Sequence, residues 1–288
     1  MPNLRSGKKD PGSTFCVNRC FTTVFTILFT TSVFISKIYV SGTLIFVARG
    51  DNSQSVQVVD VVSGDTYSYC SSDLPDYPLN PWAAAGGLFE NTPVVCGHSS
   101  YTKECHSYDK ASNTWQLFGN LVTGRRHHCA LIFREALWVT GGYNGNRLRS
   151  TEIMALDGTV TSGPNLPADR YGHCMVVLNN DEFMILGSDS SGSLYRNTMT
   201  YNANSGTFTN GPSMLHDRRD GACSIFYSKL HNDRPVLLVA GGYGDNGTPE
   251  LLDYSQENAQ WEEGMNFTDN SRSMVYKIQN KRETDNKN

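Results

Sequence analysis

An apolar run that ends in glycine recurs five times along this chain, and its periodicity limits the fold more than any other feature. The two clearest copies read ALWVTGGY at 136–143 and VLLVAGGY at 236–243. The leading glycines are Gly50, Gly97, Gly141, Gly187 and Gly241, spaced by 47, 44, 46 and 54 residues. Glycine at the end of an apolar strand is typical of a tight turn, because it adopts backbone angles closed to other residues. A repeat of this length indicates a series of similar structural units.

Two further columns keep the same register. One is an apolar residue that follows a polar turn and opens a strand: Tyr67, Trp115, Val160, Phe208 and Trp261. The other is an arginine four residues before a cysteine: Arg125 with Cys129, Arg170 with Cys174, and Arg219 with Cys223. The intervening turns are rich in Asp, Asn, Ser and Gly, which supply turn geometry. Each unit therefore holds about four short strands, which is the pattern of a propeller blade.

The repeat resembles the kelch repeat in its doubled glycine, the tyrosine that follows, the Tyr108-Asp109 pair ahead of Trp115, and the Arg-initial strands. The resemblance covers approximately residues 43–278 and implies an all-β, kelch-type β-propeller. Five units predict five four-stranded blades. The first unit lacks its own first strand, so we expect the apolar segment 273–278 to supply the innermost strand of the first blade. That arrangement would close the ring and hide two sheet edges.

The segment before the propeller has the pattern of a secretory leader. Residues 21–36 carry no charge, basic residues precede them, and small residues follow near 40–42. We expect residues 1–42 to be a signal peptide or signal anchor, 43–280 the propeller, and 281–288 a disordered polar tail. The apolar run is short against the roughly 17 to 25 residues needed to span a membrane, so contact with a membrane is expected only if it is kept as an anchor. A buried pair of strands is the alternative.

Sequons and cysteines bear on the compartment. Asn246 and Asn266 begin glycosylation sequons. Cys96 ends one strand and Cys105 lies across a short turn on the next, which predicts a hairpin disulfide. The cysteines of the Arg-Cys column occupy equivalent places on different blades, so we expect them to be too far apart to bond and to be small buried residues. The leader and the even number of remaining cysteines favour a secreted or lumenal protein, and the unpaired column favours the cytoplasmic alternative.

Arginines concentrate on one predicted face, where the loops between second and third strands and between successive blades emerge. Beyond residue 42 the chain keeps 19 of its 24 Lys and Arg and 27 of its 28 Asp and Glu, a net charge of minus eight. The candidate binding residues on this face are Arg125, Arg126, His128, Tyr143, Arg147, Arg149, Arg170, Arg218, Arg219 and Tyr243. Planar guanidinium groups suit carboxylates and sulfates, which predicts a protein partner with an acidic peptide, or an anionic glycan. The alternative is that Arg125, Arg170 and Arg219 pair with loop acids such as Asp169, Asp217 and Asp220 and stiffen the ring.

Other functions fit the sequence less well. Because some kelch propellers are copper oxidases or sugar epimerases, convergent His128, His173 and Tyr171 side chains would favour an enzyme. We find no nucleophile motif or phosphate loop and expect a non-catalytic binding module without a cofactor or bound metal. The acidic propeller argues against nucleic acid. Actin binding in the cytosol is a possibility that the kelch resemblance implies.

Overall fold

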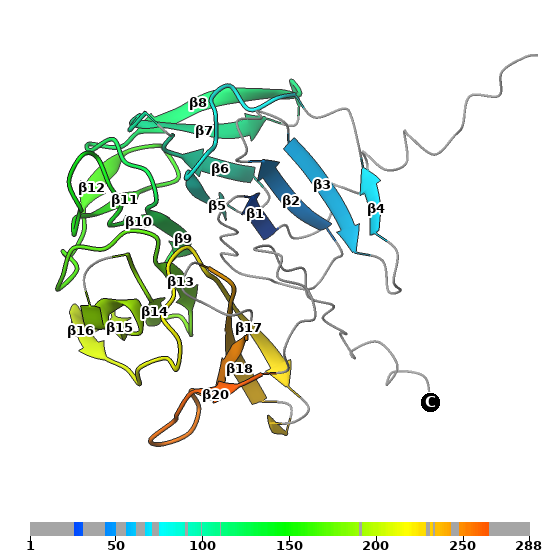
Figure 1. The fold of residues 1–288 in the computed structure, drawn as a ribbon. Coiled ribbons are helices and arrows are strands. Elements are labelled where there is room, and N and C mark those ends of the chain that lie inside the picture. Colours follow the sequence, from blue (N-terminus) through cyan, green and yellow to red (C-terminus); the bar gives the residue numbers. More distant parts are fainter. Residues whose placement is uncertain are drawn as a thin grey trace, which may run out of the picture.

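A computed structural model describes residues 75–264 except 90–91, 99, 110, 190–191, 229–230, 233 and 243–247, together with the backbone alone of four strands nearer the N-terminus. The described strands form five four-stranded sheets. Figure 1 shows the sheets following one another in chain order, with β8, β12, β16 and β20 at the periphery. This all-β arrangement of repeated sheets agrees with the predicted blades.

Sheets 2 to 5 are antiparallel meanders. Sheet 2 contains β5 (Ala85–Phe89), β6 (Thr92–Cys96), β7 (Glu104–Asp109) and β8 (Thr114–Asn120). Sheet 3 contains β9 (Cys129–Phe133), β10 (Ala136–Thr140), β11 (Thr151–Met154) and β12 (Val160–Ser162). Sheet 4 contains β13 (Cys174–Val177), β14 (Glu182–Leu186), β15 (Thr198–Asn202) and β16 (Thr207–Asn210), with the short 3₁₀ helix η1 (Gly192–Tyr195) before β15. Sheet 5 contains β17 (Ala222–Ser228), β18 (Arg234–Ala240), β19 (Glu250–Leu252) and β20 (Glu262–Glu263).

Sheet 1 differs from the others in its first strand. It contains β1 (Thr26–Thr30), β2 (Leu44–Arg49), β3 (Val56–Val61) and β4 (Tyr67–Cys70), and β1 pairs with β2 in parallel. The place expected for residues 273–278 is thus held by a strand from within the predicted leader. The segment 273–278 lies outside the described residues, and both ring closure and the leader stay predictions. No helix in the described part of the chain is long and apolar enough to cross a membrane.

The repeated glycines adopt the backbone conformation that their position in the sequence predicts. Gly97, Gly141, Gly187 and Gly241 have φ between +58° and +81°. At Gly141, an added Cβ would also lie 2.4 Å from the carbonyl oxygen of Arg170 in the next sheet. Glycine is therefore required for the turn and for the close approach of neighbouring sheets.

Apolar side chains from facing sheets make the core between them. Between sheets 3 and 4, Trp138 packs edge-on against Phe183, and Met175 belongs to the same cluster. Between sheets 4 and 5, the cluster includes Leu186 and Trp261. Because both faces of an inner sheet are covered in this way, its strands alternate between residues that face the preceding sheet and residues that face the next.

The hairpin disulfide is present as predicted. Cys96 on β6 lies directly opposite Cys105 on β7, and the two residues form a disulfide with a Cα–Cα distance of 4.1 Å. The short turn that joins the two strands holds the cysteines at this pairing.

The structure contradicts the prediction that the column cysteines are too far apart to bond. Cys174 and Cys223 form a disulfide between sheets 4 and 5, with a Cα–Cα distance of 6.0 Å. The reason is a one-residue error in the assumed register. In sheets 3 and 4 the cysteine, Cys129 or Cys174, pairs with the residue just before the leading glycine. In sheet 5 the residue at that pairing is Ala222, one position before Cys223.

That offset turns Cys223 towards the preceding sheet. Cys174 faces sheet 5 and Cys223 faces sheet 4, within one core cluster. Cys129 faces sheet 4 in the same way as Cys174 faces sheet 5, but it is buried as a free thiol in the cluster that holds Met175. Burial raises the pKa of the Cys129 thiol to about 12, so it stays protonated.

Candidate binding surface

Three arginines at equivalent positions fix each sheet to its own leading-glycine turn. Arg125, Arg170 and Arg218 are exposed by only 0, 0 and 2%. The Nη1 groups of the first two donate to the carbonyl oxygens of Gly141 and Gly187 at 2.7 and 3.0 Å. Arg218 donates in the same way to Gly241 at 3.1 Å. The same contact therefore recurs in sheets 3, 4 and 5.

Buried carboxylates neutralise two of these arginines. Arg125 forms an ion pair with Glu152, and Arg218 forms one with Glu250 at 2.9 Å. Each glutamate also accepts two backbone N–H bonds. Glu152 of sheet 3 accepts them from Val122 and Thr123, in the loop before that sheet. The equivalent bonds in sheet 5 come from Leu215 and His216. The carboxylate therefore joins three parts of the chain: the third strand of a sheet, the buried arginine of that sheet, and the loop that enters the sheet from the preceding one.

Sheet 4 lacks this carboxylate. Met199 stands where the neighbouring sheets have glutamate, and Arg170 donates instead to the side-chain oxygen of Asn197. Pro167 stands in the loop where Val122 and Leu215 supply N–H donors, and proline has none. Burial lowers the pKa of the Arg170 guanidinium to about 10. Sheet 4 therefore lacks both the glutamate acceptor and one of the backbone N–H donors that sheets 3 and 5 share.

These contacts correct part of the sequence prediction. Arg125, Arg170 and Arg218 have their side chains inside the protein and do not belong to a binding surface. The ion-pair alternative is correct for Arg125 and Arg219, but Arg125 pairs with the strand residue Glu152 rather than with a loop acid. It is wrong for Arg170, which donates to the neutral amide of Asn197. Of Arg125, Arg170 and Arg219, Arg219 alone pairs with an acid named in that prediction, since its Nε lies 3.5 Å from Asp220. Asp217 pairs instead with Arg196, at 2.6 Å.

His128 is also buried, so it is not part of a binding surface. It is fully inaccessible, as is its equivalent His173, whose Nε2 lies 2.7 Å from the hydroxyl of Thr140. Burial, followed by the nearby Arg125, lowers the pKa of His128 well below its usual value. Burial and then Arg170 lower the pKa of His173 to about 3. Both rings are therefore neutral and buried. Among the described residues, no group of three or more His, Cys, Asp or Glu side chains is arranged to hold a metal ion.

A column of left-handed residues lies two positions before each inner strand. Ala83, His127, Gly172 and Asp220 have φ of 58°, 50°, 64° and 57°. The N–H of His127 donates to the carbonyl of Ala83, that of Gly172 to His127, and that of Asp220 to Gly172, at 2.7 to 2.8 Å. This chain of bonds crosses four sheets, and it holds His127 and Asp220 in a backbone conformation that is costly for residues other than glycine.

Arg126 lies at the centre of an aromatic cluster beside this column. Its guanidinium carbon is 5.3, 4.9 and 5.5 Å from the ring centroids of Trp82, Tyr101 and Tyr143. The backbones of Arg126 and Tyr143 exchange two hydrogen bonds of 3.0 and 2.8 Å, which fix the two side chains relative to each other. Cation–π contacts of this kind stabilise the arginine by about 0.5 to 2 kcal/mol each.

Arg147 and Tyr171 extend the cluster towards sheet 4. The guanidinium carbon of Arg147, an exposed residue, lies 5.7 Å from the Tyr171 ring, which in turn packs at 5.7 Å from Tyr143. The edge of His127 packs against Trp82 and Tyr171. We call the following seven residues the arginine–aromatic surface: Trp82, Tyr101, Arg126, His127, Tyr143, Arg147 and Tyr171.

An acidic group borders this surface on the side of sheet 5. The Tyr171 hydroxyl donates to Asp189 at 2.5 Å, and Arg219 forms an ion pair with the same carboxylate. Burial acts to raise the pKa of Asp189, but the bonds from Tyr171 and Arg219 bring it below its usual value. Asp189 and Asp220 together balance Arg219, so Arg219 adds little net charge. Within the arginine–aromatic surface, the exposed arginine is Arg147.

The remaining predicted residues divide between the surface and the undescribed part of the chain. Arg149 is exposed after the turn that carries Arg147. Tyr243 and the predicted glycosylation sites Asn246 and Asn266 lie outside the described residues. Tyr101 and the contacts of His127 with Trp82 and Tyr171 were not predicted from the sequence. The position two residues before each inner strand would have indicated His127, whereas nothing in the repeat marks Tyr101.

Comparisons with known proteins agree with a repeated propeller fold. The chain is 28% identical over 142 residues to Beta-scruin and 26% over 162 residues to Alpha-scruin, both of Limulus polyphemus. It is 24% identical over 166 residues to the human Leucine-zipper-like transcriptional regulator 1. The solved structure of YjhT aligns with a TM-score of 0.62 at 12% identity, covering 81% of this chain and 83% of that one. These likenesses support a kelch-like β-propeller.

The matches leave much of the related proteins uncovered. The aligned segments take up 46 to 51% of this propeller chain but only 15 to 19% of the scruins and the regulator. No protein-family model matches the chain. At 12% identity, the likeness to YjhT concerns the propeller fold alone.

Proposed function

We propose that this chain is a non-catalytic protein-binding module that uses the arginine–aromatic surface to engage an acidic segment of its partner. The observation that carries the proposal is the packing of Arg126 against three aromatic rings, with the exposed Arg147 next to them. Tyr, Trp and Arg are the residue types that contribute most to protein interfaces. Here they come from loops of three sheets and are held by backbone bonds, so little side-chain freedom would be lost on binding.

The charges on this surface indicate how a partner would be oriented. Arg147 can offer its planar fork to a carboxylate, whereas Arg219 is already balanced by Asp189 and Asp220. An acidic residue of the partner is therefore expected over Arg147 and Arg126. Neutral or basic groups are expected towards Asp189. A partner that is uniformly acidic fits this pattern less well.

Filamentous actin is the first partner to test, because the kelch resemblance implies it and because the scruins are among the matched proteins. Co-sedimentation of the full chain with filamentous actin would be compared between the natural chain, Arg147→Ala and Arg134→Ala. Arg134 is a matched control, since it is an exposed arginine on a hairpin turn at the opposite end of the sheets. Binding that falls for Arg147→Ala and not for Arg134→Ala supports the surface. A chain that never sediments with actin removes actin from the candidates.

A synthetic peptide with a short Glu stretch followed by neutral residues tests the chemistry of the surface separately. Fluorescence anisotropy should show binding that weakens with added salt and by roughly tenfold in Arg126→Ala, since a charge-assisted bond contributes about 1.5 to 3 kcal/mol. Equal peptide binding by the natural chain, Arg126→Ala and Arg147→Ala would contradict the proposed role of this surface.

The compartment remains part of the proposal. The two disulfides favour an oxidising location such as the secretory pathway. A cytoplasmic location would fit actin better, so the partner and the compartment are linked. Determining the redox state of Cys174 and Cys223 in the native protein bears on both.

A further inference from the structure

A polar groove lies between sheets 4 and 5, at the end of the sheets opposite the arginine–aromatic surface. It is formed by the β13–β14 turn and the outer strands of sheet 4 on one side, and by the β19–β20 turn on the other. These turns join first to second and third to fourth strands, so they emerge opposite the loops that carry Arg126 and Arg147. The groove has a volume of about 490 Å³, within the range of roughly 300–1,000 Å³ that small-molecule sites occupy.

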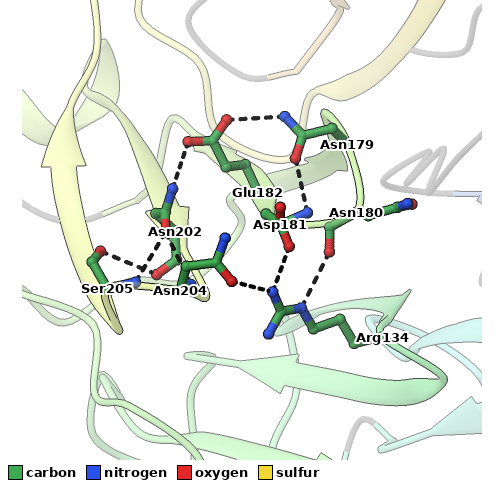
Figure 2. A network of polar contacts seen from close by, with 8 residues as sticks. All are labelled: Arg134, Asn179, Asn180, Asp181, Glu182, Asn202, Asn204 and Ser205. Carbon is green, nitrogen blue, oxygen red and sulfur yellow. Dashed lines mark hydrogen bonds and ion pairs between the residues drawn. The ribbon is translucent and has the colours of Figure 1, made fainter.

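Glu182 lines this groove with its carboxylate held in place. Its Oε1 accepts a hydrogen bond from Asn202 and its Oε2 accepts one from Asn179, both at 3.0 Å. Figure 2 shows these amides on either side of the carboxylate, with Asp181 turned instead towards Arg134 of sheet 3. Each carboxylate oxygen can accept a further bond, and its orientation is fixed before any ligand arrives.

Tyr254 lines the facing side. It is half-buried, and its hydroxyl makes no hydrogen bond to another described residue. Burial, followed by Tyr227 and Asp253, raises the pKa of this phenol to about 12, so it is a neutral donor and acceptor. A partly buried tyrosine hydroxyl usually has a partner, and here the groove is where one would be placed.

Amide groups complete the lining. Asn210 and Asn258 border the groove, and their side chains make no hydrogen bond to another described residue. Glu182 is the one charged residue among the lining residues. The groove thus offers several mixed donors and acceptors, a single fixed carboxylate and no positive charge. An anionic ligand would be repelled by Glu182, and an apolar ligand would leave the amides and the phenol without partners.

The geometry points to a binding site for a neutral saccharide in this groove, with sugar hydroxyls donating to Glu182 and bonding to Tyr254, Asn210 and Asn258. Neutral sugars carry both donors and acceptors at each hydroxyl, which matches a lining of amides, a phenol and one carboxylate. This site is separate from the protein-binding surface, because the two lie at opposite ends of the sheets. It does not depend on the proposed partner.

Binding of lactose, N,N′-diacetylchitobiose and 3′-sialyllactose to the full chain tests the inference by saturation-transfer NMR and calorimetry. We expect at least one of the two neutral sugars to bind with a Kd of about 1 mM or tighter. The sialylated sugar, which adds a carboxylate to lactose, should bind more weakly than lactose. Failure of both neutral sugars to bind, or tighter binding of the sialylated one, would overturn the inference.

Three variants locate the site. Tyr254→Phe removes only the hydroxyl, and Asn210→Ala removes an amide from an exposed residue; each should weaken sugar binding by roughly 2- to 10-fold. Arg147→Ala, at the other end, should bind sugar as the natural chain does. Unchanged sugar binding in both Tyr254→Phe and Asn210→Ala would show that the groove is not the site.

Discussion

His127 and Asp220 come from sheets 3 and 5, yet the imidazole Nδ1 lies 3.3 Å from the carboxylate Oδ1, across Gly172 of the sheet between them. Both side chains are mostly buried, at 15 and 16% exposure. The contact is possible because the residue between them has no side chain. Both residues have a left-handed backbone that glycine adopts without strain, as Gly172 does at the equivalent position. Strain of this kind, kept where glycine would relieve it, is typical of functional sites.

We predict that Gly172→Ala destabilises the protein by about 2 kcal/mol or more. An added Cβ would lie 2.7 Å from Asp220 Oδ1, and the residue would keep φ near +64°. Gly206→Ala is the matched control, because its φ is +69° but nothing lies within 4 Å of the added Cβ. Urea unfolding should show a loss of about 1 kcal/mol for the control. Equal losses for the two variants would mean that the packing between His127 and Asp220 is loose.

Removing the repeated arginine should cost more in sheet 3 than in sheet 4. Arg125→Met leaves the Glu152 carboxylate buried and unpaired, which costs about 3 to 5 kcal/mol. Arg170→Met leaves no buried carboxylate, since Met199 replaces the glutamate. The measurement is the free energy of unfolding in urea for both variants and for Arg125→Met combined with Glu152→Met. We expect the combined variant to be more stable than Arg125→Met alone; a lower stability would show that the glutamate acts mainly through its backbone bonds.

Stability should fall in mild acid because of the buried histidines. Burial lowers the pKa of His173 from 6.5 to about 3 in the folded protein. Below pH 6.5 the unfolded chain therefore binds a proton that the folded chain does not, and stability declines as pH falls from 6.5 towards 3 by up to about 1.4 kcal/mol per pH unit for each such histidine.

Urea unfolding at several pH values between about 6.5 and 5, above the range in which most carboxylates titrate, measures this slope. His173→Gln keeps an amide that can bond Thr140 and removes the titrating ring, so its average slope over this range should be smaller by about 1 kcal/mol per pH unit. A slope as steep as that of the natural chain would contradict a neutral buried His173.

The disulfide between sheets 4 and 5 should stabilise the protein more than the hairpin disulfide. Cys174 and Cys223 are 49 residues apart, against 9 for Cys96 and Cys105. Loop-closure entropy gives about 4 kcal/mol for the longer loop and about 3 for the shorter. Melting temperatures of Cys174→Ala/Cys223→Ala and Cys96→Ala/Cys105→Ala test the order. Peptide mapping without reductant must find both bonds; free thiols at Cys174 and Cys223 would contradict the pairing.

Expression in a secretory eukaryotic cell should release a chain that begins near Thr43 and carries glycan on Asn246 or Asn266. The basic, apolar and small-residue order of residues 1–42 is the reason. Intact mass before and after glycosidase, with the N-terminal sequence, is the measurement. A cell-retained, unglycosylated product that keeps residues 26–30 would instead favour β1 as a permanent strand of sheet 1.

Features that depend on local chemistry could be predicted from the sequence. The spacing of the apolar runs predicted repeated four-stranded sheets, the leading glycines predicted the left-handed turns, and the Cys96–Cys105 pair followed from one short hairpin. Each of these depends on residues close together in the chain, so strand period and turn geometry suffice to predict it.

The face that each inner-strand residue presents could not be predicted from the sequence, because it depends on how the strands pair. Arg219 and Cys223 have the same spacing as Arg125 and Cys129, yet the pairing of Ala222 with Ala240 makes Arg218 the buried arginine and turns Cys223 towards Cys174. Successive strand residues point to opposite faces, so a shift of one residue exchanges surface for core, and only the pairing with the neighbouring strand fixes that shift.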